Sequence, residues 1–230
     1  MFFWDPTFIL LIPGIIIAAW AQSKVTSTFD KFYRVGSLSG ITAAQAARQI
    51  LNKQGLEDIR VEVVPGKLSD HYDPRAKALR LSQQVYGSNS LAAIGVAAHE
   101  AGHAIQHDEG YAPLAIRSTL VPVAQFGSSA AWILLLLGLF MGLPGLARLG
   151  VYAFAAVVLF QLVTLPVEFN ASSRALALLE GGGYLTREEI PQTKKVLDAA
   201  ALTYVAAALM GILQLVRLLI ISGMLGRRDE

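Results

Sequence analysis

Four long and mainly apolar stretches of the chain contain no charged residue, and this feature constrains the fold more than any other. They are residues 6–23, 118–147, 149–167 and 199–216. A helix needs about 20 apolar residues to cross a hydrocarbon core that is roughly 30 Å thick. The sequence therefore predicts an α-helical multi-pass membrane protein with about four transmembrane helices. We expect these helices at residues 6–22, 120–142, 149–167 and 199–221.

The composition agrees with this prediction. Only 16% of the 230 residues are charged, whereas soluble domains average about 25%. The formal net charge of +2 is too small to indicate a nucleic-acid ligand, and no basic stripe runs along the chain. We therefore expect the lipid bilayer as the surroundings of the protein and no nucleic-acid partner.

Turn residues divide the second and third spans. The sequence Gly142-Leu143-Pro144-Gly145 is rich in glycine and proline, so the two spans are predicted to form a transmembrane hairpin. The first span is predicted to be a retained anchor, because Met1–Asp5 lacks the Lys or Arg of a signal peptide.

Basic residues near the membrane ends predict the topology. Eight of them lie on the side of the large loops and three on the other, which predicts that the large loops are in the cytoplasm. The two groups are Lys24, Lys31, Arg34, Arg117, Arg174, Arg187, Lys194 and Lys195 against Arg148, Arg227 and Arg228.

These spans divide the chain into five segments. The expected segments are an N-terminal transmembrane anchor at 1–22, a cytoplasmic α+β region at 23–117, a transmembrane hairpin at 118–167, a helix and connector at 168–198, and a C-terminal transmembrane helix with its tail at 199–230.

The region before the hairpin mixes helical and strand patterns. A helix is predicted over 42–54, with Thr42 as its N-cap, and a strand over 60–64. Residues 68–72 and 77–82 flank a predicted hairpin turn, and we expect strand 77–82 to pair with an extended substrate. A turn then leads into a further helix over about 90–106.

That last helix carries the motif His99-Glu100-Ala101-Gly102-His103, an H-E-x-x-H. Residues four apart on a helix lie on one face, so both imidazoles can reach one metal ion. Because the chain has no cysteine, the metal must be held by nitrogen and carboxylate ligands. The motif predicts one Zn²⁺ per chain, with Glu100 as the general base that activates a water.

A third ligand is needed, and three residues are candidates. His107 continues the series but lies too far along a straight helix, and we expect it to face solvent or to support a ligand. His71 could ligate, stabilise an oxyanion, or serve only the hairpin structure. Glu168, at the end of the third span, is favoured because the membrane hairpin returns the chain beside the H-E-x-x-H helix. The predicted metal ligands are therefore His99, His103 and Glu168.

Two further polar residues lie near the same membrane side. Arg174 could bind a substrate carboxylate or support the metal ligands, although an interfacial arginine reaching for water is an alternative. Tyr204 could donate a hydrogen bond to the oxyanion, although interfacial tyrosines are common in membrane proteins.

Four runs of sequence together resemble the YugP-type neutral zinc metallopeptidases of bacterial membranes. The runs are 70–74 (DHYDP), 95–106 (GVAAHEAGHAIQ), 165–176 (LPVEFNASSRAL) and 199–208 (AAALTYVAAA). The layout is also similar to that of HtpX-type membrane proteases, in which an Asp four residues after the Glu ligand orients a zinc histidine. Here that position is Ser172, so the resemblance implies that Ser172, Asn170 or another carboxylate takes this role. The resemblance also implies the inner (plasma) membrane of a bacterial cell as the location.

These observations predict a membrane-embedded zinc endopeptidase of gluzincin type, with a small α+β zincin-like catalytic region and a polypeptide substrate in or near the membrane. Two alternatives stay open. A site-2-type intramembrane protease would need a late Asp ligand, and the last span has none after Asp198. A non-proteolytic scaffold or adaptor would use zinc for stability, and association with a partner protein or a second copy is also left open.

Overall fold

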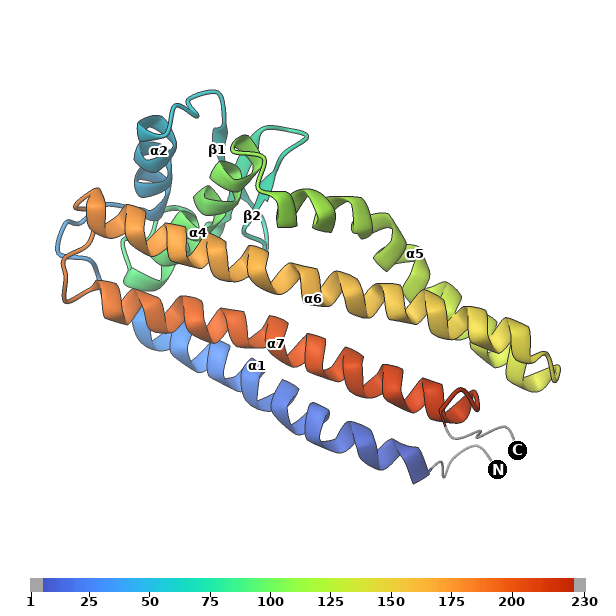
Figure 1. Cartoon of the computed structure of the whole chain (residues 1–230). Coiled ribbons are helices and arrows are strands. Elements are labelled where there is room, and N and C mark those ends of the chain that lie inside the picture. Colours follow the sequence, from blue (N-terminus) through green and yellow to red (C-terminus); the bar gives the residue numbers. More distant parts are fainter. Residues whose placement is uncertain (1–5, 226–230) are drawn as a thin grey trace. The chain divides into compact units, whose positions relative to one another are not determined.

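The computed structural model of the chain describes residues 6–225 and is mostly helical (Figure 1). The N-terminal tip and the C-terminal tip, with Arg227 and Arg228 of the topology prediction, lie outside the described residues. The helices are η1 Pro6–Leu11, α1 Ile12–Tyr33, α2 Ala43–Lys53, α3 Gln83–Tyr86, α4 Leu91–Asp108, α5 Ala112–Phe140, α6 Pro144–Gly181 and α7 Ile190–Ile221. The strands are β1 Arg60–Val64, β2 His71–Asp73 and β3 Ala78–Ser82.

Four helical segments of the described residues are long and apolar enough to cross a membrane, which confirms the predicted number. They are Pro6–Tyr33, Ala112–Phe140, Pro144–Gly181 and Ile190–Ile221. Three of them are longer than the charge-free run inside them, because a helix continues wherever its backbone hydrogen bonds continue, whatever the side chains. The charge-free run 118–147 instead extends past the end of α5, through the turn and into α6. The expected segment boundary at residues 167 and 168 thus falls inside α6, which runs through Pro166 without a break.

The chain divides into two compact units. The first contains Met1–Gln22, Ala115–Leu165 and Thr203–Glu230, and the second contains Ser23–Leu114 and Pro166–Leu202. The second unit includes the α+β region and the part of α6 that begins at Pro166. Both of these segments are needed to describe the candidate metal site.

A three-stranded sheet with the order β1-β3-β2 lies in the second unit. Strand β3 pairs in parallel with β1 and antiparallel with β2. The expectation that strand 77–82 pairs with a substrate is therefore wrong, because β3 is the middle strand and both of its edges are taken. The β2–β3 hairpin itself is confirmed, and β2 is an edge strand.

Helix ends in the second unit follow their local sequence signals. Thr42 and Gln45 form the capping box that begins α2, as predicted. The Ser90 side chain accepts a hydrogen bond from the Ala93 amide and begins α4. The segment between β3 and Ser90 contains a short helix, α3, where the sequence indicated only a turn.

The core of the second unit packs α2 and the sheet around α4. Ile50 and Leu51 of α2, Leu79 and Leu81 of β3, and Ile94 of α4 are fully buried in it. Nearly all of α4 is lined by small or apolar side chains, so this helix is an internal element of the unit. Polar side chains on such a helix need specific partners.

In the first unit, α5 and α6 form the predicted hairpin. Gly142 adopts a positive φ of 66° in the turn between them, a conformation that favours glycine. The helices approach closely at Gly150, where an added Cβ would lie 2.7 Å from the Ala131 carbonyl oxygen. This contact leaves no space for a side chain.

Replacing Gly150 by Ala is therefore expected to lower the free energy of unfolding by about 1–3 kcal/mol, because the added methyl group must push the two helix backbones apart. Equilibrium unfolding of the purified protein in detergent micelles, with sodium dodecyl sulfate as denaturant and circular dichroism as the signal, measures this change.

Gly127 provides the matched control on the same hairpin. A Cβ there would meet its nearest neighbours, including the Ala153 carbonyl oxygen, at 3.6 Å, which is ordinary contact. Gly127→Ala should be neutral or stabilising by up to about 1 kcal/mol, since alanine favours helix. Equal destabilisation by both substitutions would contradict the proposed close packing at Gly150.

Candidate metal centre

Helix α4 presents two histidines to one place. His99 and His103 are four residues apart, and their ring centroids are 4.7 Å apart in an edge-to-face arrangement. Both side chains are mostly buried, with 16% and 13% of their surface exposed. The H-E-x-x-H spacing thus does bring the two imidazoles together, as predicted.

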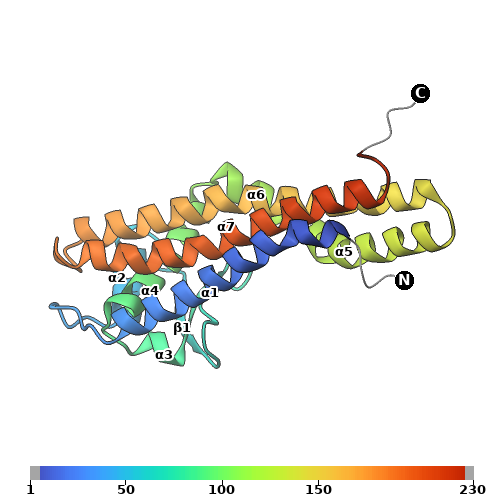
Figure 2. The ribbon, with the colours of Figure 1, turned by 90° about the horizontal axis from the view of Figure 1, so that it is seen from below.

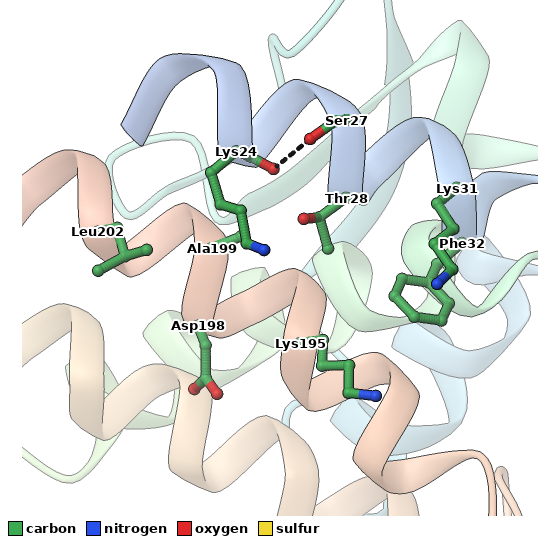
Figure 3. A pocket seen from close by; sticks show the side chains of 9 residues that line it. All are labelled: Lys24, Ser27, Thr28, Lys31, Phe32, Lys195, Asp198, Ala199 and Leu202. Atoms are coloured by element: carbon green, nitrogen blue, oxygen red, sulfur yellow. Dashed lines mark hydrogen bonds between the residues drawn. The ribbon is translucent and has the colours of Figure 1, made fainter. Parts of the chain in front are cut away.

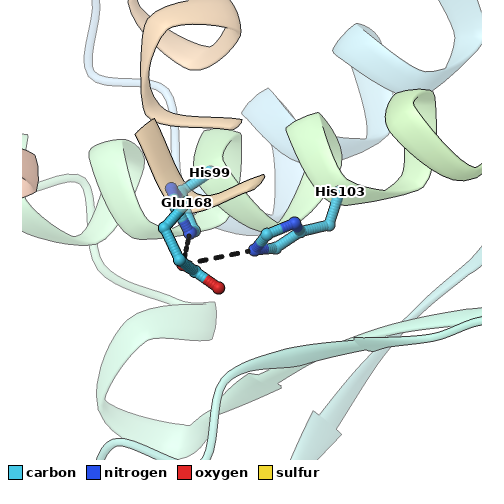
Figure 4. A group of neighbouring side chains, drawn as sticks. All are labelled: His99, His103 and Glu168. Atoms are coloured by element: carbon cyan, nitrogen blue, oxygen red, sulfur yellow. Dashed lines mark hydrogen bonds and ion pairs between the residues drawn. The ribbon is translucent and has the colours of Figure 1, made fainter. Parts of the chain in front are cut away.

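Glu168 of α6 completes the group (Figure 4). Its Oε2 atom lies 3.2 Å from His99 Nε2 and 3.7 Å from His103 Nε2, and the residue is only 2% exposed. The potential ligand atoms of the three residues all lie within 4.8 Å of one another. The structure therefore brings together the three residues that the sequence predicted as ligands.

The donor set fits a zinc ion. Tetrahedral zinc with bonds of about 2.0–2.1 Å places its ligand atoms roughly 3.3 Å apart, close to the two observed nitrogen–oxygen distances. Two imidazoles and one carboxylate are the ligands of a common class of catalytic zinc site, which keeps its fourth position for water. His99, His103 and Glu168 would hold the ion.

A close approach of two backbones makes this grouping possible. Gly102 lies between the two histidines of the motif, and a Cβ there would be 2.8 Å from the carbonyl oxygen of Ala171 on α6. Any side chain at Gly102 would push α6 away. Because Glu168 is about one turn before Ala171, this contact brings its carboxylate to the histidines.

Each histidine has a separate partner for its other ring nitrogen. His99 Nδ1 is 3.1 Å from the Ser172 hydroxyl, and His103 Nδ1 is 3.0 Å from the Gln106 side-chain oxygen. A proton on Nδ1 leaves Nε2 with its lone pair toward the metal position, which is the tautomer that a ligand needs. Ser172 thus occupies the orienting position that the resemblance implied.

Gln106 was missed by the sequence analysis as a functional residue. It is fully buried, and its side-chain nitrogen donates to the Val167 carbonyl and to Asn170 Oδ1, both at 2.9 Å. One signal could have found it: Gln106 lies three residues after His103, on the same face of α4. Its amide orients His103 and also binds α4 to α6.

Asn170 and Arg174 act farther from the metal position than the sequence suggested. Asn170 contacts Gln106 and accepts a hydrogen bond of 2.8 Å from Arg174 Nε. The Arg174 guanidinium also pairs with Glu109 at 2.6 Å. Hydrogen bonding to Arg174 lowers the pKa of Glu109. The described contacts of Arg174 are therefore structural, and a role in binding a substrate carboxylate stays a prediction.

The side chain of Glu100 is turned toward the sheet. Its Oε2 accepts a hydrogen bond of 3.0 Å from the Tyr72 amide of β2. This bond fixes the carboxylate beside the edge strand rather than among the three ligands. The sequence did not predict it, because it depends on how the hairpin packs against α4.

The remaining predicted residues are not among the three side chains grouped as a candidate metal site. His71 is exposed on β2, and its Nδ1 is 2.7 Å from the Ser69 carbonyl oxygen. His107 is exposed, as expected, and its Nδ1 is 3.3 Å from the Tyr72 hydroxyl. Tyr204 belongs to the first compact unit and is 38% exposed. Roles for His71 and Tyr204 in catalysis stay predictions.

The carboxylates give the group a negative character. Burial of His103 opposes its charged form, but the contact with Glu168 and the charge of Glu100 outweigh this effect and raise the pKa of His103. Such surroundings favour a bound cation.

Comparison with known proteins identifies the family. Residues 7–223 match the model of a family described as "putative neutral zinc metallopeptidase". The chain belongs to this family. It is also 48% identical over 221 residues to the "putative membrane protease YugP" of Bacillus subtilis (strain 168), covering 96% of this chain and 97% of that relative. No solved structure matches the chain.

Removing either orienting group should weaken zinc binding. Ser172→Ala and Gln106→Leu each leave a ligand histidine without its Nδ1 partner, and loss of such partners typically costs about 10–100-fold in metal affinity. Competition between the purified protein and a chromophoric zinc chelator measures the change.

Ser173 supplies the matched control, because it neighbours Ser172 in α6 but is exposed. Ser173→Ala should leave zinc affinity unchanged within about twofold. If Ser172→Ala and Ser173→Ala bind zinc equally well, the hydroxyl of Ser172 does not orient His99.

Proposed function

We propose that the protein is a membrane-anchored zinc endopeptidase of gluzincin type, which hydrolyses peptide bonds with one Zn²⁺ per chain. The observation that carries this proposal is the group of His99, His103 and Glu168. Glu100 lies on the same helix as the two histidines, and its carboxylate accepts a hydrogen bond from the Tyr72 amide. The family and the Bacillus subtilis relative support a protease role. The four candidate membrane helices support a membrane location.

The residues of the site divide the chemistry among them. A zinc ion, when bound, supplies a Lewis acid and lowers the pKa of a bound water toward about 7. Glu100 takes the proton of the attacking water and delivers it to the leaving amine. The hydrogen bond from the Tyr72 amide holds the Glu100 carboxylate in one orientation before this proton transfer. Ser172 and Gln106 keep the ligand nitrogens aimed at the metal.

The substrate in this proposal is an extended polypeptide that lies along β2. Strand β2 is at the edge of the sheet, and Tyr72 of this strand is bonded to the proposed general base. Main-chain hydrogen bonds to an edge strand hold a peptide without demanding a particular side chain. The membrane anchors favour substrates that are themselves in or near the membrane.

An intramembrane protease of the site-2 type is less well supported. Within residues 6–225, α4 with its H-E-x-x-H is not among the four candidate membrane-spanning helices. The carboxylate beside the histidines is Glu168 of α6, and not a late aspartate. The first observation favours a site outside the hydrocarbon layer, and the second differs from the aspartate ligand that the site-2 class would use.

Substitution of Glu100 by Gln should abolish proteolysis while the metal stays bound. The amide cannot accept the proton of water, and loss of a general base typically costs about 10²–10⁴-fold in rate. Cleavage of fluorescent casein by the purified, zinc-loaded protein measures activity, and elemental analysis of the same samples measures zinc.

Glu168→Ala separates the roles of the two carboxylates, because it should reduce the zinc content and activity together. Wild-type protein without protease activity, but with zinc that stabilises it against heat, would favour the scaffold alternative. Equal activity of wild type and Glu100→Gln would overturn the mechanism.

The natural absence of cysteine allows a direct test of topology. The basic residues beside the large loops favour a cytoplasmic active site. A single cysteine at Lys67, in the α+β region, should be protected from a membrane-impermeant maleimide in intact bacterial cells, and one at Gly145, in the hairpin turn, should be labelled. The reverse pattern would place the proposed active site outside the cytoplasm.

A further inference from the structure

A groove in the second unit lies between the end of α1 and the start of α7, well separated in the sequence from the metal ligands. In both views of the chain these two helix ends lie side by side (Figures 1 and 2). The groove has a volume of about 500 Å³. Its lining comes from one face of each helix: Lys24, Ser27, Thr28, Lys31 and Phe32 of α1, and Lys195, Asp198, Ala199 and Leu202 of α7.

The floor and the rim of this groove differ in character. Thr28, Phe32 and Ala199 are buried and make a floor that is mainly apolar, with one hydroxyl. Lys24, Lys31 and Lys195 are exposed and stand around it. Figure 3 shows the side chains of Lys24 and Thr28 projecting from α1 toward α7. A small anion above this floor would meet ammonium groups from two helices.

The single carboxylate of the groove does not neutralise these lysines. Asp198 is bonded through both oxygens to Lys194, at 2.8 and 2.6 Å, and Lys194 does not line the groove. Among residues 6–225, no ion pair joins Lys24, Lys31 or Lys195 to a carboxylate. The ring of Phe32 lies 5.3 Å from the Lys31 ammonium. The rim is therefore cationic.

The position of the groove along its helices indicates which anion it meets. Lys24 directly follows the charge-free run 6–23 of α1, and Asp198 directly precedes the charge-free run 199–216 of α7. Both helices thus change from apolar to charged at the groove, as they would at the polar surface of a bilayer. Anionic lipid head groups lie at this depth, and clustered lysines beside a membrane helix attract them.

We propose that this groove binds the phosphodiester head group of an anionic bilayer lipid. Lys24, Lys31 and Lys195 contact the phosphate, the hydroxyls of Ser27 and Thr28 are the further donors available to it, and Leu202 lies on the side from which the acyl chains enter. The proposal does not depend on protease activity or on the metal.

A lipid-association measurement on the full-length protein tests the proposal. The purified protein is placed in nanodiscs of phosphatidylcholine that contain a trace of spin-labelled phosphatidylglycerol or spin-labelled phosphatidylcholine. Electron paramagnetic resonance then gives the motionally restricted fraction of each lipid. Wild type should favour phosphatidylglycerol by at least about fivefold, the effect expected of a single favourably placed lysine.

Two triple variants of equal charge provide the decisive comparison. Lys24→Gln/Lys31→Gln/Lys195→Gln should reduce the preference below about twofold. The control variant Lys53→Gln/Lys67→Gln/Arg75→Gln removes the same charge from the α+β region. It also removes a matching ammonium–ring contact, because Lys53 lies over the Tyr184 ring as Lys31 lies over the Phe32 ring. This control should keep the wild-type preference. Equal losses in both variants, or no preference in wild type, would overturn the proposal.

A free phosphate ion is the competing ligand of the same chemistry. Inorganic phosphate should displace the spin-labelled phosphatidylglycerol no better than chloride at equal ionic strength. Stronger displacement by phosphate would overturn the lipid assignment. If the triple variant of the groove fails to fold, as judged by its melting temperature, the single variants Lys195→Gln and Lys67→Gln are compared instead. Lys195→Gln should then show a smaller loss of the preference for phosphatidylglycerol, and Lys67→Gln should show none.

Discussion

The contact between Gly102 of α4 and the Ala171 carbonyl of α6 is the constraint on which the candidate site depends. It brings two helix backbones together where one carries the histidines and the other carries Glu168. A bond between a carboxylate and a histidine on separate helices requires such an approach, because a glutamate side chain is short. The buried amide of Gln106 then bridges the same two helices. Thus one glycine inside the H-E-x-x-H motif determines whether the third ligand can reach the other two.

Most of the architecture could be predicted, because its signals are local. Charge-free runs located the membrane helices, and the residues at Thr42 and Ser90 located two helix starts. The true lengths of the helices could not be predicted this way. Hydropathy indicates where a helix is apolar, whereas α6 continues from Glu168 to Gly181 on backbone hydrogen bonds and on the burial of one face, which carries Ala171, Ala175 and Leu179.

The site shows the same division between local and non-local information. The histidines follow from spacing on one helix, and Glu168 followed from the return of the chain through a membrane hairpin. The bond from the Tyr72 amide to Glu100 could not be derived, because it forms only when the β2–β3 hairpin packs against α4. The bonds from the Gln106 amide to α6 likewise depend on how α6 packs against α4. The order of strands also lay beyond local signals: β1 and β3 are parallel neighbours, so the strand expected at an edge became the central one.

Helix α6 leads to a consequence for the synthesis of the protein. Glu168 follows the H-E-x-x-H by more than sixty residues, and the whole hairpin lies between them. While the ribosome has produced only the first half of the chain, the nascent protein has His99, Glu100 and His103 but lacks the third residue of the candidate ligand set. The set becomes complete only once the hairpin has been made and α6 has packed against Gly102. The order of synthesis thus delays assembly of the candidate metal site until the whole hairpin and the first part of the second unit's α6 segment have been made.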